Sequence, residues 1–209
     1  MVDIIDIGMG NVQSIINILV RLGINPKVAH TPDSLSSKTL ILPGVGSALP
    51  FMQKLCEYSF DKAILDHVKQ GKRIIGICLG FQVMTEFSEE DGGTNCLGLI
   101  NTQTISIKKH YHSSNHNQWE TFSLRKDDLH LPEQCDSILT LRKRVVHGRV
   151  FYNHEYGVKI NSDDIGFSRI NSDSLSSFAS MYSNGNIIGL QFHPEKSQDT
   201  GLQLFSLLL

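Results

Sequence analysis

Short apolar runs alternate with amphipathic stretches along the first part of the chain. The short runs suit strands that are buried on both faces of a sheet. The longer stretches repeat their apolar side chains every three or four residues, as helices do. Residues 2–7, 25–30, 39–42 and 74–77 are the predicted strands, and residues 12–22, 51–70 and 79–87 are the predicted helices. This order predicts an α/β fold with a largely parallel sheet flanked by helices.

The second half of the chain changes in character. Strand-like runs follow one another at residues 97–109, 149–160, 175–182 and 187–192, with little helical pattern between them. The sequence Ser183-Asn184-Gly185-Asn186 carries the Asn-Gly signal of a tight hairpin between the last two runs. The second half is therefore expected to be rich in antiparallel strands. No linker divides the chain, so residues 1–209 are expected to form a single domain.

Three histidines lie close together in a segment without regular pattern: His110, His112 and His116. Such a cluster could suggest a metal site, but no carboxylate or cysteine completes a ligand set nearby. We interpret the segment as a solvated loop and expect no metal.

Composition narrows the classes of function. The 209 residues are 40% hydrophobic and 19% charged, with a net charge of −2, which is ordinary for a soluble globular protein. No basic field points to nucleic acid, and no long apolar run or leader-like segment points to a membrane or to export. We therefore expect a cytoplasmic protein. Its scattered cysteines, Cys56, Cys78, Cys96 and Cys135, argue against a disulfide framework and against a zinc site.

Cys78 stands at the predicted corner between a strand and a helix. Gly76 and Gly80 flank it, so the backbone can turn sharply and the thiol can stand clear of the sheet. The predicted helix N-terminus would favour the thiolate. Most buried cysteines are small apolar filler, and this motif alone leaves that interpretation open.

Two further segments supply what a cysteine nucleophile needs. His193-Pro194-Glu195 follows the last predicted strand, and in extended backbone His193 and Glu195 would project to the same side, so the carboxylate could orient the imidazole. The turn at residues 43–46, with two glycines, could offer backbone N–H groups to an oxyanion. Together they indicate nucleophilic catalysis.

A nucleotide site is the weaker interpretation of the N-terminus. Gly8 and Gly10 join the first predicted strand to a helix, as in dinucleotide-binding proteins, but Gln13 stands where that motif has a third glycine.

The chain contains the motifs DIGMGN, LPGVGS, GICLGFQVM, FYNHEY and QFHPEKSQ, spread from one end to the other. Through these motifs it resembles the class I, triad-type glutamine amidotransferases, and within them most closely the glutaminase subunits of imidazole glycerol phosphate synthase. It implies the class I glutamine amidotransferase fold and hydrolysis of L-glutamine to glutamate and ammonia without a cofactor. It also implies that ammonia passes to a HisF-like (β/α)₈-barrel cyclase subunit in histidine biosynthesis.

The resemblance also assigns roles to residues of this chain. It implies a catalytic triad of Cys78, His193 and Glu195. The other implied residues are the oxyanion donors Gly44, Val45, Gly46 and Leu79, the substrate contacts Gln82, Glu90 and Tyr156, and the partner contacts Asn11, Trp119 and Lys196.

Two segments depart from the family pattern and keep alternatives open. Residues 117–120 read Asn-Gln-Trp-Glu where the family has Gly-Trp-Asn, and Glu155 replaces a serine or threonine. A paralogue that supplies ammonia for amidino-sugar formation in surface polysaccharide synthesis is one alternative. A pseudo-glutaminase scaffold is the non-enzymatic one. An α/β cysteine hydrolase is a further rival, although its acid normally precedes the histidine.

Overall fold

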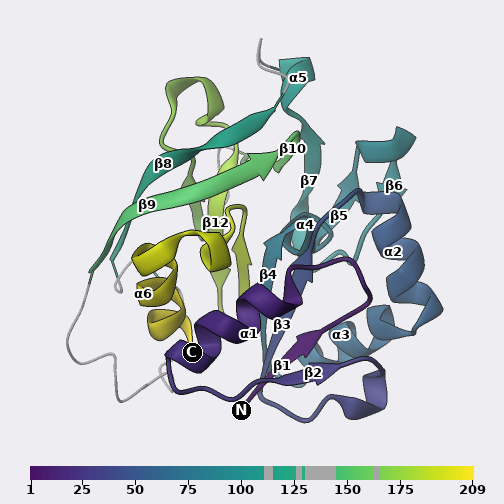
Figure 1. Cartoon of the computed structure of the whole chain (residues 1–209). Coiled ribbons are helices and arrows are strands. Elements are labelled where there is room, and N and C mark those ends of the chain that lie inside the picture. The colour runs from purple at the N-terminus through teal and green to yellow at the C-terminus, as the bar shows by residue number, and fades with distance from the viewer. Residues whose placement is uncertain (111–114, 126–128, 130–144, 162–164) are drawn as a thin grey trace.

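A mixed sheet of seven strands forms the centre of the computed structural model, which describes all residues except 111–114, 126–128, 130–144 and 162–164 (Figure 1). The strands pair in the order β11-β12-β13-β4-β3-β1-β2. Pairing is parallel from β2 to β13 and antiparallel between β13 and β12, as predicted; the antiparallel edge strand β11 was not predicted. Their bounds are β1 Val2–Ile5, β2 Lys27–Ala29, β3 Thr39–Gly44, β4 Arg73–Cys78, β11 Phe167–Arg169, β12 Ala179–Asn184 and β13 Ile187–Leu190.

Helices cover both faces of this sheet because alternate side chains of its buried strands point to opposite faces. Ile75 and Ile77 of β4 belong to the apolar cluster with α1 (Val12–Arg21) and α6 (Gln198–Leu208). Ile74 belongs to the opposite cluster, with α2 (Ala48–Glu57) and α3 (Phe60–Lys69). No helix of the described residues is long and apolar enough to cross a membrane.

Two predicted helices are shorter than the sequence pattern indicated. The predicted helix 51–70 is broken at Ser59, whose φ is 59°, into α2 (Ala48–Glu57) and α3 (Phe60–Lys69). The predicted helix 79–87 is wrong beyond its first turn, since α4 spans only Leu79–Gln82.

Tertiary pairing explains the short α4. The N–H groups of residues 97–100 donate to the carbonyls of Val83, Met84 and Thr85, so these carbonyls cannot serve a helix. Phe87 lies instead in strand β5 (Thr85–Ser88).

Smaller sheets lie beyond the ends of the central strands. One contains β5 with β6 (Thr94–Asn95), β7 (Ile100–Ser106) and β10 (Tyr156–Val158). The other is an antiparallel ribbon of β8 (His116–Arg125) and β9 (Val145–His154), which crosses the upper end of the sheet in Figure 1. Short helical turns complete the described chain: η1 Pro32–Ser34, η2 Glu90–Gly92, α5 Ile107–His110, η5 Asp173–Leu175 and η6 Pro194–Lys196.

The interpretation of the histidine segment as a solvated loop is wrong for His116. His116 begins β8 and is only 2% exposed, and Glu120 on the same face of the strand is hydrogen-bonded to it. The sequence pattern does not predict this strand because two of its inward-facing side chains are ionisable, which hides the alternation of apolar and polar residues. His112 lies outside the described residues.

The corner between β3, β4 and α4 brings backbone into direct contact with backbone. A Cβ atom added to Gly80 would lie 1.9 Å from the Leu42 carbonyl oxygen, and one added to Gly44 would lie 2.4 Å from the Gly80 nitrogen. A Cβ on Gly76 would lie 2.3 Å from the Met84 sulfur. The glycines around Cys78 therefore let the turn after β4 press against β3, which fixes the direction of the thiol.

We expect Gly80→Ala to destabilise the fold by about 3 kcal/mol, because the clashing atom is backbone and cannot rotate away. Gly71→Ala is the matched control. Gly71 has φ +72° but open space around its Cα, so alanine there should cost only about 1 kcal/mol. Urea denaturation of both variants measures the difference, and equal losses would contradict the contact.

Candidate active site

Cys78 occupies a strained backbone conformation at the end of β4. Its φ of 54° and ψ of −112° fall where residues with a side chain are rarely found, and such strain concentrates at functional sites. The side chain is 6% exposed, and its sulfur lies 4.0 Å from the Asn153 carbonyl oxygen on β9. Because α4 has only one turn, its dipole contributes less to thiolate formation than the predicted longer helix would.

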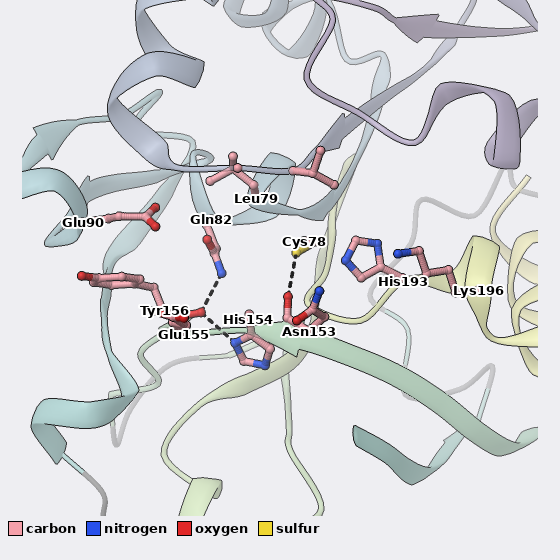
Figure 2. Close-up of a pocket in the computed structure, with 12 residues that line it drawn as sticks. Cys78, Leu79, Gln82, Glu90, Asn153, His154, Glu155, Tyr156, His193 and Lys196 are labelled. Carbon is pink, nitrogen blue, oxygen red and sulfur yellow. Dashed lines mark hydrogen bonds between the residues drawn. The ribbon is translucent and has the colours of Figure 1, made fainter. Parts of the chain in front are cut away.

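His193 reaches the same place from the other end of the chain. Strand β13 runs parallel to β4, with Leu190 opposite Ile77, so both strands end at one edge of the sheet. The backbone N–H of His193 donates to the Phe151 carbonyl at 2.9 Å, which ties the segment to β9. Figure 2 shows the imidazole beside the Cys78 sulfur.

Glu195 meets His193 through a helical turn. The expectation of an extended His-Pro-Glu segment is wrong, because residues Pro194–Lys196 form the turn η6. The turn still brings Glu195 Oε1 to 2.8 Å from His193 Nδ1, and both side chains are buried. Asn11 donates its side-chain N–H to the same oxygen at 3.0 Å. Asn11, expected at a partner surface, thus holds the carboxylate from a position 184 residues earlier in the chain.

The charges of this group favour a protonated imidazole. Burial alone would lower the pKa of His193, but hydrogen bonds with Cys78 and Glu195 outweigh it and raise that pKa to about 10. Burial would raise the pKa of Glu195, yet the hydrogen bond from His193 holds it below its ordinary value. At neutral pH the imidazolium can therefore donate a proton beside the thiol.

A cavity of about 360 Å³ opens in front of the thiol (Figure 2). It gathers most of the residues expected at the site, and three more that the sequence analysis missed. The expected ones are Val45, Gly46, Cys78, Leu79, Gln82, Glu90, Tyr156, His193 and Lys196, and the missed ones are Asn153, His154 and Glu155. The missed residues all lie in the FYNHEY motif, so that motif was the signal that could have found them.

The expected oxyanion donors differ in whether their backbone N–H groups already donate a hydrogen bond within the protein. The Leu79 N–H heads α4, where no preceding turn supplies a helical acceptor. The Val45 N–H donates to the Met9 carbonyl at 2.9 Å, so it can reach the cavity only if its peptide rotates. Gly46, with φ +102°, and Gly44 flank this peptide and give it the freedom to do so.

Residues expected to contact substrate form the far wall of the cavity. The side-chain nitrogen of Gln82 donates to the Tyr156 carbonyl at 2.7 Å and to Gln191 Oε1 at 3.2 Å. Both N–H groups of Gln82 are thereby used in holding the wall. Burial raises the pKa of Glu90 to about 7, although the Ala48 N–H donates to its carboxylate. A cationic group bound beside Glu90 would restore its charge.

The expected partner residues Trp119 and Lys196 both contact the ring of Phe151. Trp119 packs on Phe151 with ring centroids 5.5 Å apart, and the Lys196 ammonium lies 5.8 Å from the centre of the Phe151 ring. Lys196 also lines the cavity, whereas Trp119 does not. Lys196 therefore joins this surface to the active site.

Comparison with known proteins places the chain in a class. The family model of class-I glutamine amidotransferases matches residues 3–206, so the chain belongs to this family and is a glutamine amidotransferase. Among its relatives, the imidazole glycerol phosphate synthase subunit HisH of Halalkalibacterium halodurans is 35% identical over 98% of this chain and 92% of that protein.

Two further comparisons concern chain organisation and fold. The chloroplastic imidazole glycerol phosphate synthase hisHF of Arabidopsis thaliana is 31% identical over 97% of this chain, which spans only 33% of that protein. A chain in the structure of PurLQS from Thermotoga maritima aligns with a TM-score of 0.74 and 19% identity, covering 99% of this chain and 96% of that one. The expected class I fold is thereby confirmed.

Stability is expected to fall in acid because of His154, which is buried below the cavity. Burial, with the neighbouring His116, lowers the pKa of His154 to about 3, so the folded protein keeps it neutral. The unfolded chain protonates it near pH 6.5, so stability is lost as pH falls below that value, by about 2 kcal/mol between pH 6.5 and 5. Urea denaturation at several pH values measures this loss, and His154→Gln should show a flatter dependence. Parallel curves would contradict the assignment.

Proposed function

We propose that this chain is a glutaminase that hydrolyses L-glutamine through Cys78, His193 and Glu195, and that the ammonia serves a synthase partner. The single observation that carries the proposal is the buried chain from thiol to imidazole to carboxylate at the edge of the cavity. Family membership supports the same reaction class, because glutamine amidotransferases take their nitrogen from a side-chain amide.

The first half-reaction uses the thiolate and the imidazolium together. The Cys78 sulfur attacks the amide carbon of glutamine, forming a carbon–sulfur bond and an oxyanion. The Leu79 N–H stabilises this oxyanion, joined by the Val45 N–H once its peptide has rotated. When the carbon–nitrogen bond breaks, His193 gives its proton to the departing nitrogen, which leaves as ammonia.

The second half-reaction regenerates the enzyme. His193, now neutral, takes a proton from water as the water attacks the thioester carbon. The carbon–sulfur bond breaks, glutamate is released, and the thiolate is restored beside the imidazolium. Glu195 and Asn11 take no proton in either half, but hold the imidazole in the orientation that both halves need.

We propose a (β/α)₈-barrel cyclase as the partner and histidine biosynthesis as the pathway. The names of the relatives support this, since they are subunits of imidazole glycerol phosphate synthase, and in the plant relative the matching region is part of a longer chain. Trp119 and Lys196 are the proposed contacts, because Lys196 links the outer aromatic surface to the cavity.

Glu155 favours one second candidate. Its carboxylate stands where the family that this chain resembles has a serine or threonine, and it lines the cavity. A different barrel, in amidino-sugar synthesis, would account for such a change at the cavity mouth while leaving glutamine hydrolysis intact.

Cys78→Ser is expected to lower ammonia release by at least about a thousand-fold while the chain stays folded, since members of a triad act as a unit. The analogue 6-diazo-5-oxo-L-norleucine should alkylate Cys78 and spare Cys56, Cys96 and Cys135, as read by peptide mass spectrometry. Undiminished turnover in Cys78→Ser would end the proposal.

Glutamine turnover is expected to rise about a hundred-fold or more when the proper barrel and its substrate are added, because an oxyanion donor is then restored. Lys196→Met should reduce this stimulation more than it reduces basal turnover. The measurement compares the chain alone with mixtures containing each barrel homologue of the same organism. Equal rates in all mixtures would contradict coupling, and stimulation only by an amidino-sugar barrel would support the second candidate.

A further inference from the structure

A line of buried polar side chains runs from the ribbon to the wall of the cavity. Glu120 Oε1 lies 2.9 Å from His116 Nε2, and His116 Nδ1 lies 2.9 Å from His154 Nε2. His154 Nδ1 then lies 2.7 Å from the Tyr156 carbonyl oxygen, as the dashed line in Figure 2 marks. The three side chains are 8%, 2% and 6% exposed. No step of the proposed hydrolysis uses Glu120 or His116.

The end of the line fixes where the protons lie. A carbonyl oxygen only accepts hydrogen bonds, so His154 must carry its proton on Nδ1. Burial keeps His154 neutral, which leaves Nε2 as an acceptor. His116 Nδ1 must therefore donate to it, and the orientation of the whole line follows from one backbone carbonyl.

The other end of the line supplies the proton that this arrangement requires. His116 Nε2 faces a carboxylate oxygen, so one further proton must lie between them. Whether that proton rests on the imidazole or on the carboxylate, His116 keeps its own proton on Nδ1. Burial would raise the pKa of Glu120, but hydrogen bonds from His116 and Gln118 hold it below its ordinary value, which favours the ionised carboxylate.

The carbonyl at the end of the line also receives the Gln82 amide. Tyr156 oxygen accepts one bond from β9, through His154, and one from α4, four residues after the nucleophile. The Gln82 bond ties the wall formed by residues 154–156 to α4, the turn that follows Cys78, and the His154 bond holds the carbonyl within that wall. If His154 turned its proton to Nε2, this oxygen would lose one of its two side-chain donors, and only Gln82 and the backbone pairing of β10 with β7 would hold it.

We propose that Glu120 and His116 are positioning residues: they fix the tautomer of His154, and through it they hold the Tyr156 carbonyl and the wall against which glutamine binds. The proposal rests on the proposed glutaminase function. It goes beyond that function because it gives a role to Glu120 and His116, which contact neither the substrate nor the thiol.

Packing alone does not account for the line. An ionisable pair in the interior costs desolvation that an apolar pair of the same size would avoid. Glu120 Oε2 is buried and has no hydrogen-bond partner among the described residues, which adds to that cost. A metal is not the reason either, because no group of three or more His, Cys, Asp or Glu in the described chain is arranged to hold one.

The tautomers can be read directly in the full chain by nitrogen NMR of the histidine rings. The rings of His116 and His154 are assigned by the signals lost in His116→Gln and His154→Gln. We expect His154 to be protonated on Nδ1 alone and His116 to be protonated on Nδ1. A His154 protonated on Nε2 would overturn the proposal without any activity measurement.

Two substitutions of Glu120 distinguish its hydrogen bond to His116 from the space that its side chain fills. Glu120→Gln should preserve the line, since its amide N–H can donate to His116 Nε2 while Nδ1 keeps its proton. Glu120→Leu can neither donate nor accept. Ser123→Ala is the control, because Ser123 is exposed on the same strand.

Two alkylating probes then report on the wall and on the thiol separately. With 6-diazo-5-oxo-L-norleucine, which needs the wall, Cys78 in Glu120→Leu should react about 10- to 100-fold more slowly, while Glu120→Gln and Ser123→Ala keep the parent rate. Iodoacetamide needs only the thiol. The rate at which it alkylates Cys78 should therefore be the same in the parent chain and in the three variants.

The outcomes distinguish this inference from the proposed function. If the parent chain is not labelled by the glutamine analogue, the glutaminase proposal fails. If the parent is labelled and Glu120→Leu is labelled equally fast, only the positioning role fails. Should Glu120→Leu not fold, the tautomer of His154 in the parent chain and the labelling rate of Glu120→Gln decide, and a slow Glu120→Gln counts against the inference.

Discussion

The structure depends on a contact between backbones that no side chain could enter. At the corner after β4, Gly80 touches the Leu42 carbonyl and Gly44 touches Gly80, so two neighbouring strands and the turn that leaves one of them are locked together. This contact supports the strained conformation of Cys78, because a residue at φ 54° persists only where its surroundings leave no alternative. The direction of the thiol, the site of the cavity and the reach required of His193 all follow from it.

Near that corner, two buried histidines have pKa values that are strongly displaced from the ordinary value. One buried set, Cys78 with His193 and Glu195, keeps an imidazole protonated, while the neighbouring His154 is kept neutral. Two histidines near one cavity thus have pKa values displaced in opposite directions. Burial alone would lower both pKa values; hydrogen bonds with Cys78 and Glu195 reverse its effect at His193, whereas the one hydrogen bond of His154 to the Tyr156 carbonyl does not.

Much of the fold could be read from the sequence, because the central strands and most helices carry clear apolar periods. The motifs around Cys78 and His193 could also be recognised in the sequence, the first by its flanking glycines and the second by Pro194. Strand β8 could not be read, since His116 and Glu120 face the interior and break the expected alternation. The contact of Asn11 with Glu195 was equally hidden, because it joins segments at opposite ends of the chain. Local patterns reveal elements, whereas polar contacts across the core depend on the finished fold.

The parallel pairing of β13 with β4 has a consequence for the life of the protein before it is complete. Synthesis proceeds from the N-terminus, so β4 and its thiol leave the ribosome more than a hundred residues ahead of His193. Until β13 docks, that cysteine has neither its base nor its carboxylate, and a nascent or truncated chain carries an ordinary thiol. Cys78 therefore gains its base and carboxylate only after nearly the whole chain has been synthesised and β13 has paired with β4.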